Sequence, residues 1–592
     1  MSLILSAAIA AALPLATPET LDAVTVTASR RPRPVAETLA DVSVIERAEI
    51  EASQAPDLLD LLRLQPGVDL SRTGGSGQAS SLFLRGTNSN QVLFLVDGVR
   101  VASSNTGATA WEHLPLDQIE RIEIVRGPRA SYYGSDAIGG VISITTRELR
   151  GASALLRLGS DGRQAGAVGY GYAGDLSSLS VQVGGEHYDG FSATLPGNFS
   201  YDPDNDGYRH RNLGLRARHQ LGNQQLSFSG LATQQDVEFD QGLTDVRQHA
   251  TALTLEGPLA QDWNHRLTLG GARDDLTTPV FFSRFITRRE NLDWVHDLAL
   301  NTSQHLVFGL SAQRERGNSI DTFSGESTYR ASLQHQAAFL GWQGHHGALE
   351  HELALRHDEH DTFGGKATAQ AALGWRLDSG RVYLSWGQGF RAPNLNELYS
   401  PGFGGLFAGN PELDPERSNS LELGFDTQIG EARFGANLYR TRIRDLVAFQ
   451  GNDSFQAVNV ARAAIDGLEL TIDRAYDALQ LGANATWQDA RDADTGLDLL
   501  RRPNLKLGVT GSYRFETAIV LSGDLNYVSE RRDFSGDLHP YTLAGVRAEW
   551  SFAPSWNLGA RLSNAFDREY SFARDFATPG RELIVTLRWQ GQ

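Results

Sequence analysis

The fold is decided by residues 74–101, GGSGQASSLFLRGTNSNQVLFLVDGVRV. Two glycine-rich polar loops, at 74–78 and 86–90, flank strands that are apolar on both faces, most clearly at 92–96 (VLFLV). A strand without polar alternation is buried on both sides. In most of the remaining chain, polar and apolar residues alternate, which gives each strand one solvent-facing side and one apolar side. The sequence therefore predicts a small, fully packed domain in front of hundreds of residues of half-exposed sheet.

From about residue 152 onward, strand follows strand at intervals of about 20 residues. In one of them Leu468, Leu470 and Ile472 alternate with polar residues. Short turns, such as those at 221 (LGNQ) and 377 (LDSG), alternate along the chain with long polar stretches such as 192–209. An even count of about 22 strands with this pattern is typical of an outer-membrane barrel, whose closure satisfies every backbone group. We therefore expect a mainly β fold with a 22-stranded antiparallel transmembrane β-barrel at residues 148–592.

The segment before the barrel has a mixed pattern. A helix is predicted at 55–64 (APDLLDLLRL), and short strands at 81–85, 91–96, 119–125 and 140–145. These elements indicate a small α+β domain over residues 36–147. A barrel of 22 strands is wide enough to leak solutes unless something fills it. We therefore expect the N-terminal domain to lie inside the barrel lumen as a plug, which makes the protein a gated importer.

The first residues have a different character. Residues 3–15 form an apolar run that is too short to span a bilayer and suits a secretory signal peptide, expected at 1–16. Residues 17–35 contain few large apolar side chains and are interrupted by Pro32 and Pro34. We interpret them as a flexible segment.

Composition excludes several classes of function. The chain has 592 residues, no cysteine and a formal net charge of −18. Cysteine nucleophiles, cysteine-ligated metals and disulfides are therefore absent, and an acidic chain is a poor partner for nucleic acid. Neither of the two lysines, Lys366 and Lys506, completes a phosphate-binding loop, and no GxSxG or HExxH motif occurs. We expect neither an enzyme nor a nucleic-acid partner.

Five motifs along the chain together resemble those of one protein family. They are DAVTVTA (22–28), RGPRASYYGSDAIGGVISI (126–144), FRAPNLNELY (390–399), NPELDPERSNSLELG (410–424) and NAFDREY (564–570). In these motifs the chain resembles the TonB-dependent outer-membrane receptors of Gram-negative bacteria, over essentially its whole length. The resemblance implies an importer in the outer membrane, surrounded by its lipid and lipopolysaccharide.

The first motif resembles the TonB box of that family, which is Asp22, Ala23, Val24, Thr25, Val26, Thr27 and Ala28 in this chain. The resemblance implies that the inner-membrane protein TonB captures this segment by strand addition. The proton gradient then acts through TonB to pull or partly unfold the plug. Taken alone, the same residues also fit a disordered linker with β-propensity.

Within the family the likeness is strongest to the transporters of cobalamin (vitamin B12), through GGSGQASSLFLRGTN, LVDGVRV and the run LLRR at 499–502. It implies substrate contacts at Ala79, Ser81, Asn88, Thr106, Gly107 and Arg501. Short polar side chains and exposed backbone groups suit a large ligand with many amides. The alternative for each residue is that it only lines a wet lumen. We further expect a monomer and a periplasmic cobalamin-binding protein downstream.

A calcium site is also predicted. Asp202, Asp204 and Asp206 alternate in the stretch YDPDNDGYRH (201–210), and carboxylates at that spacing suit Ca²⁺. In the cobalamin transporters, aspartates of neighbouring extracellular loops bind calcium and order those loops for the substrate. The resemblance places the corresponding set at Asp189, Asp204, Asp206, Asp240 and Asp245, with Asp202 beside them. The alternative is a solvated acidic loop.

Two other readings remain open. A receptor for haem or a ferric siderophore shares most of the motifs, although residues 394–409 lack the histidine that haem receptors usually carry there. A passive porin or an adhesin needs neither a plug nor a TonB box.

Overall fold

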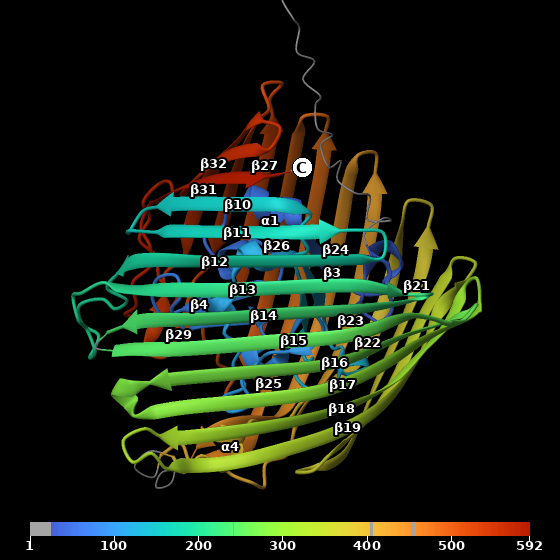
Figure 1. Ribbon diagram of the computed structural model, residues 1–592. Coiled ribbons are helices and arrows are strands. Elements are labelled where there is room, and N and C mark those ends of the chain that lie inside the picture. Colours follow the sequence, from blue (N-terminus) through green and yellow to red (C-terminus); the bar gives the residue numbers. More distant parts are fainter. Residues whose placement is uncertain (1–24, 241, 403–405, 451–455, 592) are drawn as a thin grey trace, which may run out of the picture.

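The computed structural model describes residues 25–240, 242–402, 406–450 and 456–591. Its largest part is a closed barrel of antiparallel strands, in which the first strand, β10, pairs with the last, β33, to complete the ring (Figure 1). The 22 barrel strands and the N-terminal domain confirm the predicted fold class. No helix in the described ranges is long and apolar enough to cross a bilayer.

The barrel strands follow chain order. They are β10 (Gly151–Gly159), β11 (Gln164–Ala173), β12 (Ser177–Phe191), β13 (Asp206–Leu221), β14 (Gln224–Phe239), β15 (Gly242–Ala260), β16 (Trp263–Thr278), β17 (Ser283–Asn301), β18 (Gln304–Asp321), β19 (Ser327–His346), β20 (Leu349–His360), β21 (Gly364–Leu377), β22 (Gly380–Arg391), β23 (Glu416–Ile429), β24 (Ala432–Gln450), β25 (Gln456–Tyr476), β26 (Leu479–Asp492), β27 (Leu505–Arg514), β28 (Ile519–Val528), β31 (Tyr541–Ala553), β32 (Trp556–Ser563) and β33 (Glu582–Gln590).

The two ends of the barrel differ in the length of their connections. At the turn end, tight turns such as 222–223 and 430–431 join neighbouring strands. At the loop end, long segments such as 192–205 and 564–581 join them. The connections at the loop end carry the 3-10 helix η5 (Pro279–Phe281), the helix α4 (Leu395–Tyr399) and the hairpin of β29 (Arg531–Asp533) and β30 (Gly536–Leu538).

Helix α4 was not expected, because no helical pattern was found after residue 152. It is a single short turn held by a capping box at its N-terminus. The Asn394 side chain accepts a hydrogen bond from the backbone N–H of Glu397 at 2.9 Å, and the Glu397 carboxylate accepts one from the N–H of Asn394 at 2.8 Å. Such a local cap stabilises a helix too short to show periodicity.

Alternation along each strand separates the lipid side from the lumen. In β23, Leu421, Leu423 and Phe425 are exposed on the outside, whereas Glu422 between them is buried in the lumen. The outward side chains therefore form the apolar band that a bilayer requires, and the inward polar side chains meet the plug.

The N-terminal domain lies inside the ring of barrel strands (Figure 1). Its main sheet has the order β3 (Val42–Glu46), β8 (Ile119–Arg126), β9 (Gly140–Thr146), β6 (Val92–Val96) and β7 (Val99–Arg100), and a separate hairpin pairs β4 (Val68–Arg72) with β5 (Ser80–Leu84). The helices are α1 (Arg47–Ser53), α2 (Leu58–Leu62) and α3 (Ala130–Tyr133), with 3-10 turns η1 (Val35–Glu37), η2 (Ser89–Gln91), η3 (Trp111–His113) and η4 (Leu116–Gln118).

All five residues of β6 are buried, as its continuous apolar run predicts. Phe94 in this strand packs on Trp111 with ring centroids 4.4 Å apart. The helix expected at 55–64 is shorter, because Asp57 caps its start by accepting a hydrogen bond from the Asp60 N–H at 2.9 Å. Helix α1 was not predicted, since its seven residues show too little periodicity.

Residues 17–35 were interpreted as a flexible segment. The part of it that the structure describes, from residue 25 onward, packs against the plug. Strand β1 (Thr25–Val26) pairs with β2 (Arg33–Pro34), and Val26 and Ala28 are buried. The predicted signal peptide at 1–16 and the first residues of the predicted TonB box, 22–24, lie outside the described residues.

Candidate substrate-binding site

The plug presents three loops to the loop end of the barrel. The first joins β4 to β5, the second joins β5 to β6, and the third follows β7. Ala79, Asn88 and Thr106, one from each loop, are exposed, and Ser81 and Gly107 are partly exposed. The structure thus brings the five plug residues predicted from the sequence to the same end of the plug, toward the outer mouth of the barrel.

Arg501, in the barrel loop between β26 and β27, contacts the same end of the plug; we call this end, with its three loops, the plug face. Its guanidinium donates to the Ser71 hydroxyl at 3.0 Å and to the Asp533 carboxylate at 2.8 Å. Ser71 lies opposite Ser81 in the β4–β5 ladder. Arg501 and Ser81, which are far apart in sequence, therefore belong to one polar patch.

The neighbouring Arg502 was not among the predicted site residues, although it belongs to the LLRR run. Its guanidinium donates to the Asn88 side-chain oxygen at 2.5 Å and to the Gly86 carbonyl at 3.2 Å. It also stacks over the Phe83 ring at 3.7 Å. Burial lowers the pKa of Arg502 to about 9, against the opposing effect of Asp69. Arg502 thus fixes the second plug loop, whereas Arg501 contacts strand β4, which leads into the first.

The third plug loop is held by the segment around α4. The N–H groups of Leu395 and Asn396 donate to the carbonyls of Ser104 and Asn105, each at 2.9 Å, and the Asn394 side chain donates to the Thr106 carbonyl at 3.1 Å. Beside this contact an open cleft of about 650 Å³ lies between the plug and the barrel wall. Residues lining it include Asn90, Gly107, His335, His360, Phe363 and Asn394.

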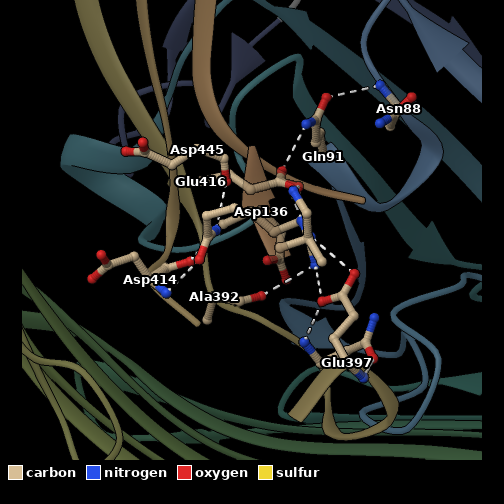
Figure 2. A network of polar contacts seen from close by, with 12 residues as sticks. Asn88, Gln91, Asp136, Ala392, Glu397, Asp414, Glu416 and Asp445 are labelled. Carbon is tan, nitrogen blue, oxygen red and sulfur yellow. Dashed lines mark hydrogen bonds and ion pairs between the residues drawn. The ribbon is translucent and has the colours of Figure 1, made fainter. Parts of the chain in front are cut away.

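A buried polar network connects the second loop to the barrel. Gln91 accepts from the Asn88 N–H at 2.9 Å and donates to Glu416 at 2.7 Å (Figure 2). Glu416 also accepts from Arg391, which donates to Glu397 at the start of α4. Asn88, a predicted substrate contact, is therefore linked through a few hydrogen bonds to the barrel segment that holds the third loop.

A second network anchors the middle of the plug. The Arg85 guanidinium forms ion pairs with two lumen carboxylates, Glu422 at 3.1 Å and Glu469 at 2.6 Å, and with Asp41 of the plug at 2.7 Å. The three carboxylates raise the pKa of Arg85 well above its usual value, despite its complete burial. The arginine therefore stays charged and tethers the plug to β23 and β25.

The N-terminal segment is held at the turn end. Thr27 donates through its N–H and its hydroxyl to Glu123, at 3.0 and 3.1 Å, and its carbonyl accepts from the Tyr133 hydroxyl at 2.6 Å. Arg31 then pairs with Asp297 of β17 at 3.1 Å. These contacts tie Thr25–Ala28 to the plug and the wall beside it.

The predicted calcium-binding aspartates are spread over strands and loops. Asp189 lies in β12, Asp206 in β13 and Asp245 in β15, and the other three lie in loops between strands. Asp206 accepts from the Ala193 N–H at 2.6 Å, and Asp240 accepts from the Thr194 hydroxyl at 2.9 Å. Asp189 pairs with His187, and Asp245 with Arg247. Within the described ranges, no three His, Asp or Glu side chains are arranged to hold a metal ion. The calcium site expected at Asp189, Asp202, Asp204, Asp206, Asp240 and Asp245 therefore stays a prediction.

Comparison with known proteins identifies the family. Residues 151–565 match the TonB dependent receptor-like, beta-barrel family, and residues 34–141 match the TonB-dependent Receptor Plug Domain. The chain belongs to the TonB-dependent receptors. As a member it is a non-enzymatic transporter of the outer membrane, and the family implies an interaction with TonB and a transported substrate.

The chain is similar to curated receptors over nearly its full length. It is 29% identical to the vitamin B12 transporter BtuB of Vibrio vulnificus (strain YJ016), covering 97% of this chain and 96% of that protein. It is 28% identical to BtuB of Vibrio cholerae serotype O1 (strain M66-2), covering 96% and 95%.

Solved structures show the same fold at lower identity. The copper transporter OprC superposes with a TM-score of 0.81 at 15% identity, covering 93% of this chain and 98% of that one. The siderophore receptor PirA from Acinetobacter baumannii superposes with a TM-score of 0.78 at 18% identity, with the same coverage. At these identities the likeness concerns the fold alone. The TonB box at residues 22–28 and the substrate contacts of this receptor stay predictions.

Proposed function

We propose that this TonB-dependent receptor imports cobalamin across the outer membrane. The observation that carries the proposal is the similarity of 28–29% to vitamin B12 transporters, which extends over the plug, the barrel and the loops. A receptor that shared only the fold with them would be expected to differ most in the plug loops, where the motifs GGSGQASSLFLRGTN and LVDGVRV lie.

The chemistry of the plug face supports this substrate. Ala79, Ser81, Asn88, Thr106 and Gly107 offer small or short polar groups, which leave space for a bulky ligand and can hydrogen-bond amide side chains. Arg501 adds one cation, and its Asp533 partner keeps its position fixed.

Transport follows from the contacts that link the plug to the barrel. Substrate bound at Asn88 acts on Gln91 and thus on the Glu416–Arg391 pair. TonB pairs with the N-terminal strand by strand addition and pulls on the plug from the turn end. Cobalamin then passes to a periplasmic cobalamin-binding protein, and the receptor works as a monomer.

Binding to the refolded receptor tests the substrate. Cyanocobalamin, haem and a panel of ferric siderophores are titrated separately and followed by their absorbance. We expect saturable binding of cyanocobalamin, and a loss of roughly tenfold in affinity on Asn88→Ala or Arg501→Gln. Arg462→Gln, on the exposed loop-end part of β25 where Arg462 pairs with Asp494, is the matched control. Saturable binding of haem or a siderophore without binding of cobalamin overturns the proposal.

Calcium is proposed separately. Asp204, Asp206 and Asp240 lie near enough for their charges to interact, and a cation that drew the loop at 192–205 inward would relieve this repulsion. We expect a calcium chelator to weaken cobalamin binding, and Asp206→Asn with Asp240→Asn to remove that sensitivity. Equal affinity with and without the chelator would refute the calcium role and leave the cobalamin proposal intact.

A further inference from the structure

One wall of the cleft beside the third plug loop is made of aromatic rings. It consists of His335 in β19, His360 at the end of β20, Phe363 in the loop that follows and Phe390 in β22. The rings of His335 and His360 are stacked with centroids 6.1 Å apart, and those of His360 and Phe363 with centroids 4.3 Å apart. Phe363 and Phe390 form a T-shaped pair at 6.4 Å. We refer to these four residues as the ring wall.

The imidazoles of the ring wall keep most of their hydrogen-bonding capacity. The His335 ring forms no hydrogen bond with any described residue. His360 accepts a hydrogen bond at Nδ1 from the N–H of Thr362 at 3.2 Å, which leaves its Nε2 free. The ring wall therefore offers a ligand both aromatic surface and hydrogen-bonding nitrogens.

The cleft is continuous with the plug face. Gly107 of the third plug loop lines the cleft and is also one of the predicted substrate contacts. Its φ is +71°, and a Cβ there would lie 3.2 Å from the side-chain nitrogen of Asn394 and 3.5 Å from the Cβ of Asn90. Glycine adopts this conformation readily and keeps the space between Asn90 and Asn394 free of a side chain. A ligand that covers Gly107 can thus reach from the plug face into the cleft.

Plug residues complete the cleft and bind the barrel beside the ring wall. The Asp136 N–H donates to the Phe390 carbonyl at 2.9 Å. The Ala392 N–H donates to the Ser135 hydroxyl at 2.8 Å, and Figure 2 shows Asp136 and Ala392 close together. Because the ring wall belongs to the barrel and Ser135 and Asp136 to the plug, movement of the plug would take the two halves of the cleft apart.

The charges that line the cleft are satisfied within the protein. Each of its three arginines is paired with a carboxylate: Arg100 with Asp136 at 2.9 Å, Arg289 with Glu315 at 3.0 Å and Arg391 with Glu416 at 2.7 Å. The cleft therefore presents rings and hydrogen-bonding groups to a ligand, and a planar neutral ring fits this lining.

We propose that the cleft binds the benzimidazole nucleotide of cobalamin, so that the receptor distinguishes complete corrinoids from those that lack the base. This inference rests on the proposed function. A cleft of about 650 Å³ holds a base with its ribose but not a whole corrinoid, so the corrin ring stays on the plug face. The base packs against the ring wall, and the free imidazole nitrogens match the hydroxyl groups of the ribose.

The test compares two ligands on the full-length refolded receptor by isothermal titration calorimetry. Cyanocobalamin carries the nucleotide, and cobinamide is the same corrin without it. We expect the wild type to bind cyanocobalamin about tenfold more tightly than cobinamide. His360→Ala and Phe363→Leu should each remove most of this ratio by weakening cyanocobalamin, with the affinity for cobinamide unchanged within about twofold. His360→Phe, which keeps a ring in the wall, should retain most of the ratio.

Two controls separate the cleft from the plug face. His357→Ala removes an exposed histidine of the same strand, paired with Glu359 at 3.5 Å, and should leave both affinities unchanged. Asn88→Ala removes a predicted contact of the plug face and should weaken both ligands to a similar extent. Heat-modified migration on gels verifies that each variant has formed its barrel.

The inference and the proposed function fail in different ways. Equal affinity of the wild type for the two corrinoids overturns the inference and leaves the proposed function intact. Equal weakening of both ligands by His360→Ala and Phe363→Leu also overturns it, because the ring wall would then only pack the loop at 361–363. Binding of neither corrinoid to the wild type refutes the proposed function and this inference with it.

Discussion

The two ends of the plug are held to the barrel by different kinds of contact. At the loop end, Arg391 and Glu416 are only 2% and 3% exposed and form part of a continuous network that reaches the plug through Gln91. At the turn end, the first ion pair after the N-terminal strand joins Arg31 and Asp297, which are 19% and 20% exposed. The strand before this pair makes a ladder of two residues, and the buried pair of Arg33 and Glu352 comes only after it in the chain. A partly solvated ion pair contributes far less than a buried network.

This difference indicates an order of events. The N-terminal strand can leave the wall while the substrate face and the central anchor at Arg85 remain in place. A pulling force at the turn end therefore meets weak contacts first and strong ones later. Because the chain has no cysteine, a single introduced cysteine carries a spin label that reports the mobility of either end alone.

A large effect is expected at the central anchor. Arg85→Ala leaves Glu422 and Glu469 buried without their cation, at a cost of about 4 kcal/mol in plug stability. Urea unfolding of the plug, followed by a label at Ala79, measures it. Combining Arg85→Met with Glu422→Gln and Glu469→Gln removes the charges together and should recover most of the loss. An unchanged urea midpoint in Arg85→Ala would show that the plug does not depend on this anchor.

A second effect concerns pH. Burial raises the pKa of Glu112 in η3 to about 8. A carboxyl group with a folded pKa above its unfolded value near 4.5 contributes fully below pH 4.5, and this contribution is lost as the pH rises through about 8. Plug stability should therefore fall between these values by roughly 5 kcal/mol, and Glu112→Gln should flatten the profile. Urea midpoints measured from pH 5 to pH 8.5 test this.

The titration of Glu112 also tests whether the two ends of the plug loosen independently. It adjoins Trp111, whose indole N–H donates to Ser89 of the second plug loop at 3.4 Å. At high pH a label at Ala79 should gain mobility before a label at Thr25 does. Simultaneous loosening of both positions would mean that the ends are not energetically separate.

A smaller effect is expected at Gln91. Gln91→Ala removes the hydrogen bonds to Asn88 and Glu416, which costs about 1–2 kcal/mol. The second plug loop loses its support, so cobalamin affinity should fall while the mobility at Thr25 stays the same. The control is Thr495→Ala, on an exposed barrel loop. A gain in mobility at Thr25 without substrate would contradict the separation of the ends.

The sequence predicts the fold much better than the contacts inside it. Continuous apolarity at β6 and strict alternation in β23 each follow from how many faces of a strand are buried, so both can be predicted from residue order. Arg391, Glu416 and Gln91 are far apart in sequence, and they meet only because barrel closure and strand register bring them together. No local pattern contains that information, and the same holds for Arg502 and Asn88.

Elements without periodicity were missed for a related reason. Helix α4 depends on one capping box, and β1 depends on pairing with β2 and on the buried wall beside it. The alternating aspartates at 202–206 are a different case. Their spacing along the chain predicts a metal site, and this stays a prediction. The first two lie in a loop, and Asp206 begins β13, where it accepts a hydrogen bond from the N–H of Ala193.

The smallest effect tests the weak end directly. Arg31→Gln removes one partly exposed ion pair, worth about 0.2–1 kcal/mol, so a label at Thr25 should become more mobile while the urea midpoint of the plug barely changes. Salt should produce the same loosening in the wild type, because exposed charges are screened. Arg33→Gln is the matched comparison, since Arg33 pairs with the fully buried Glu352. It should release the strand more completely and be insensitive to salt. If the two variants behave alike, burial does not set the strength of these contacts, and the proposed order of release is wrong.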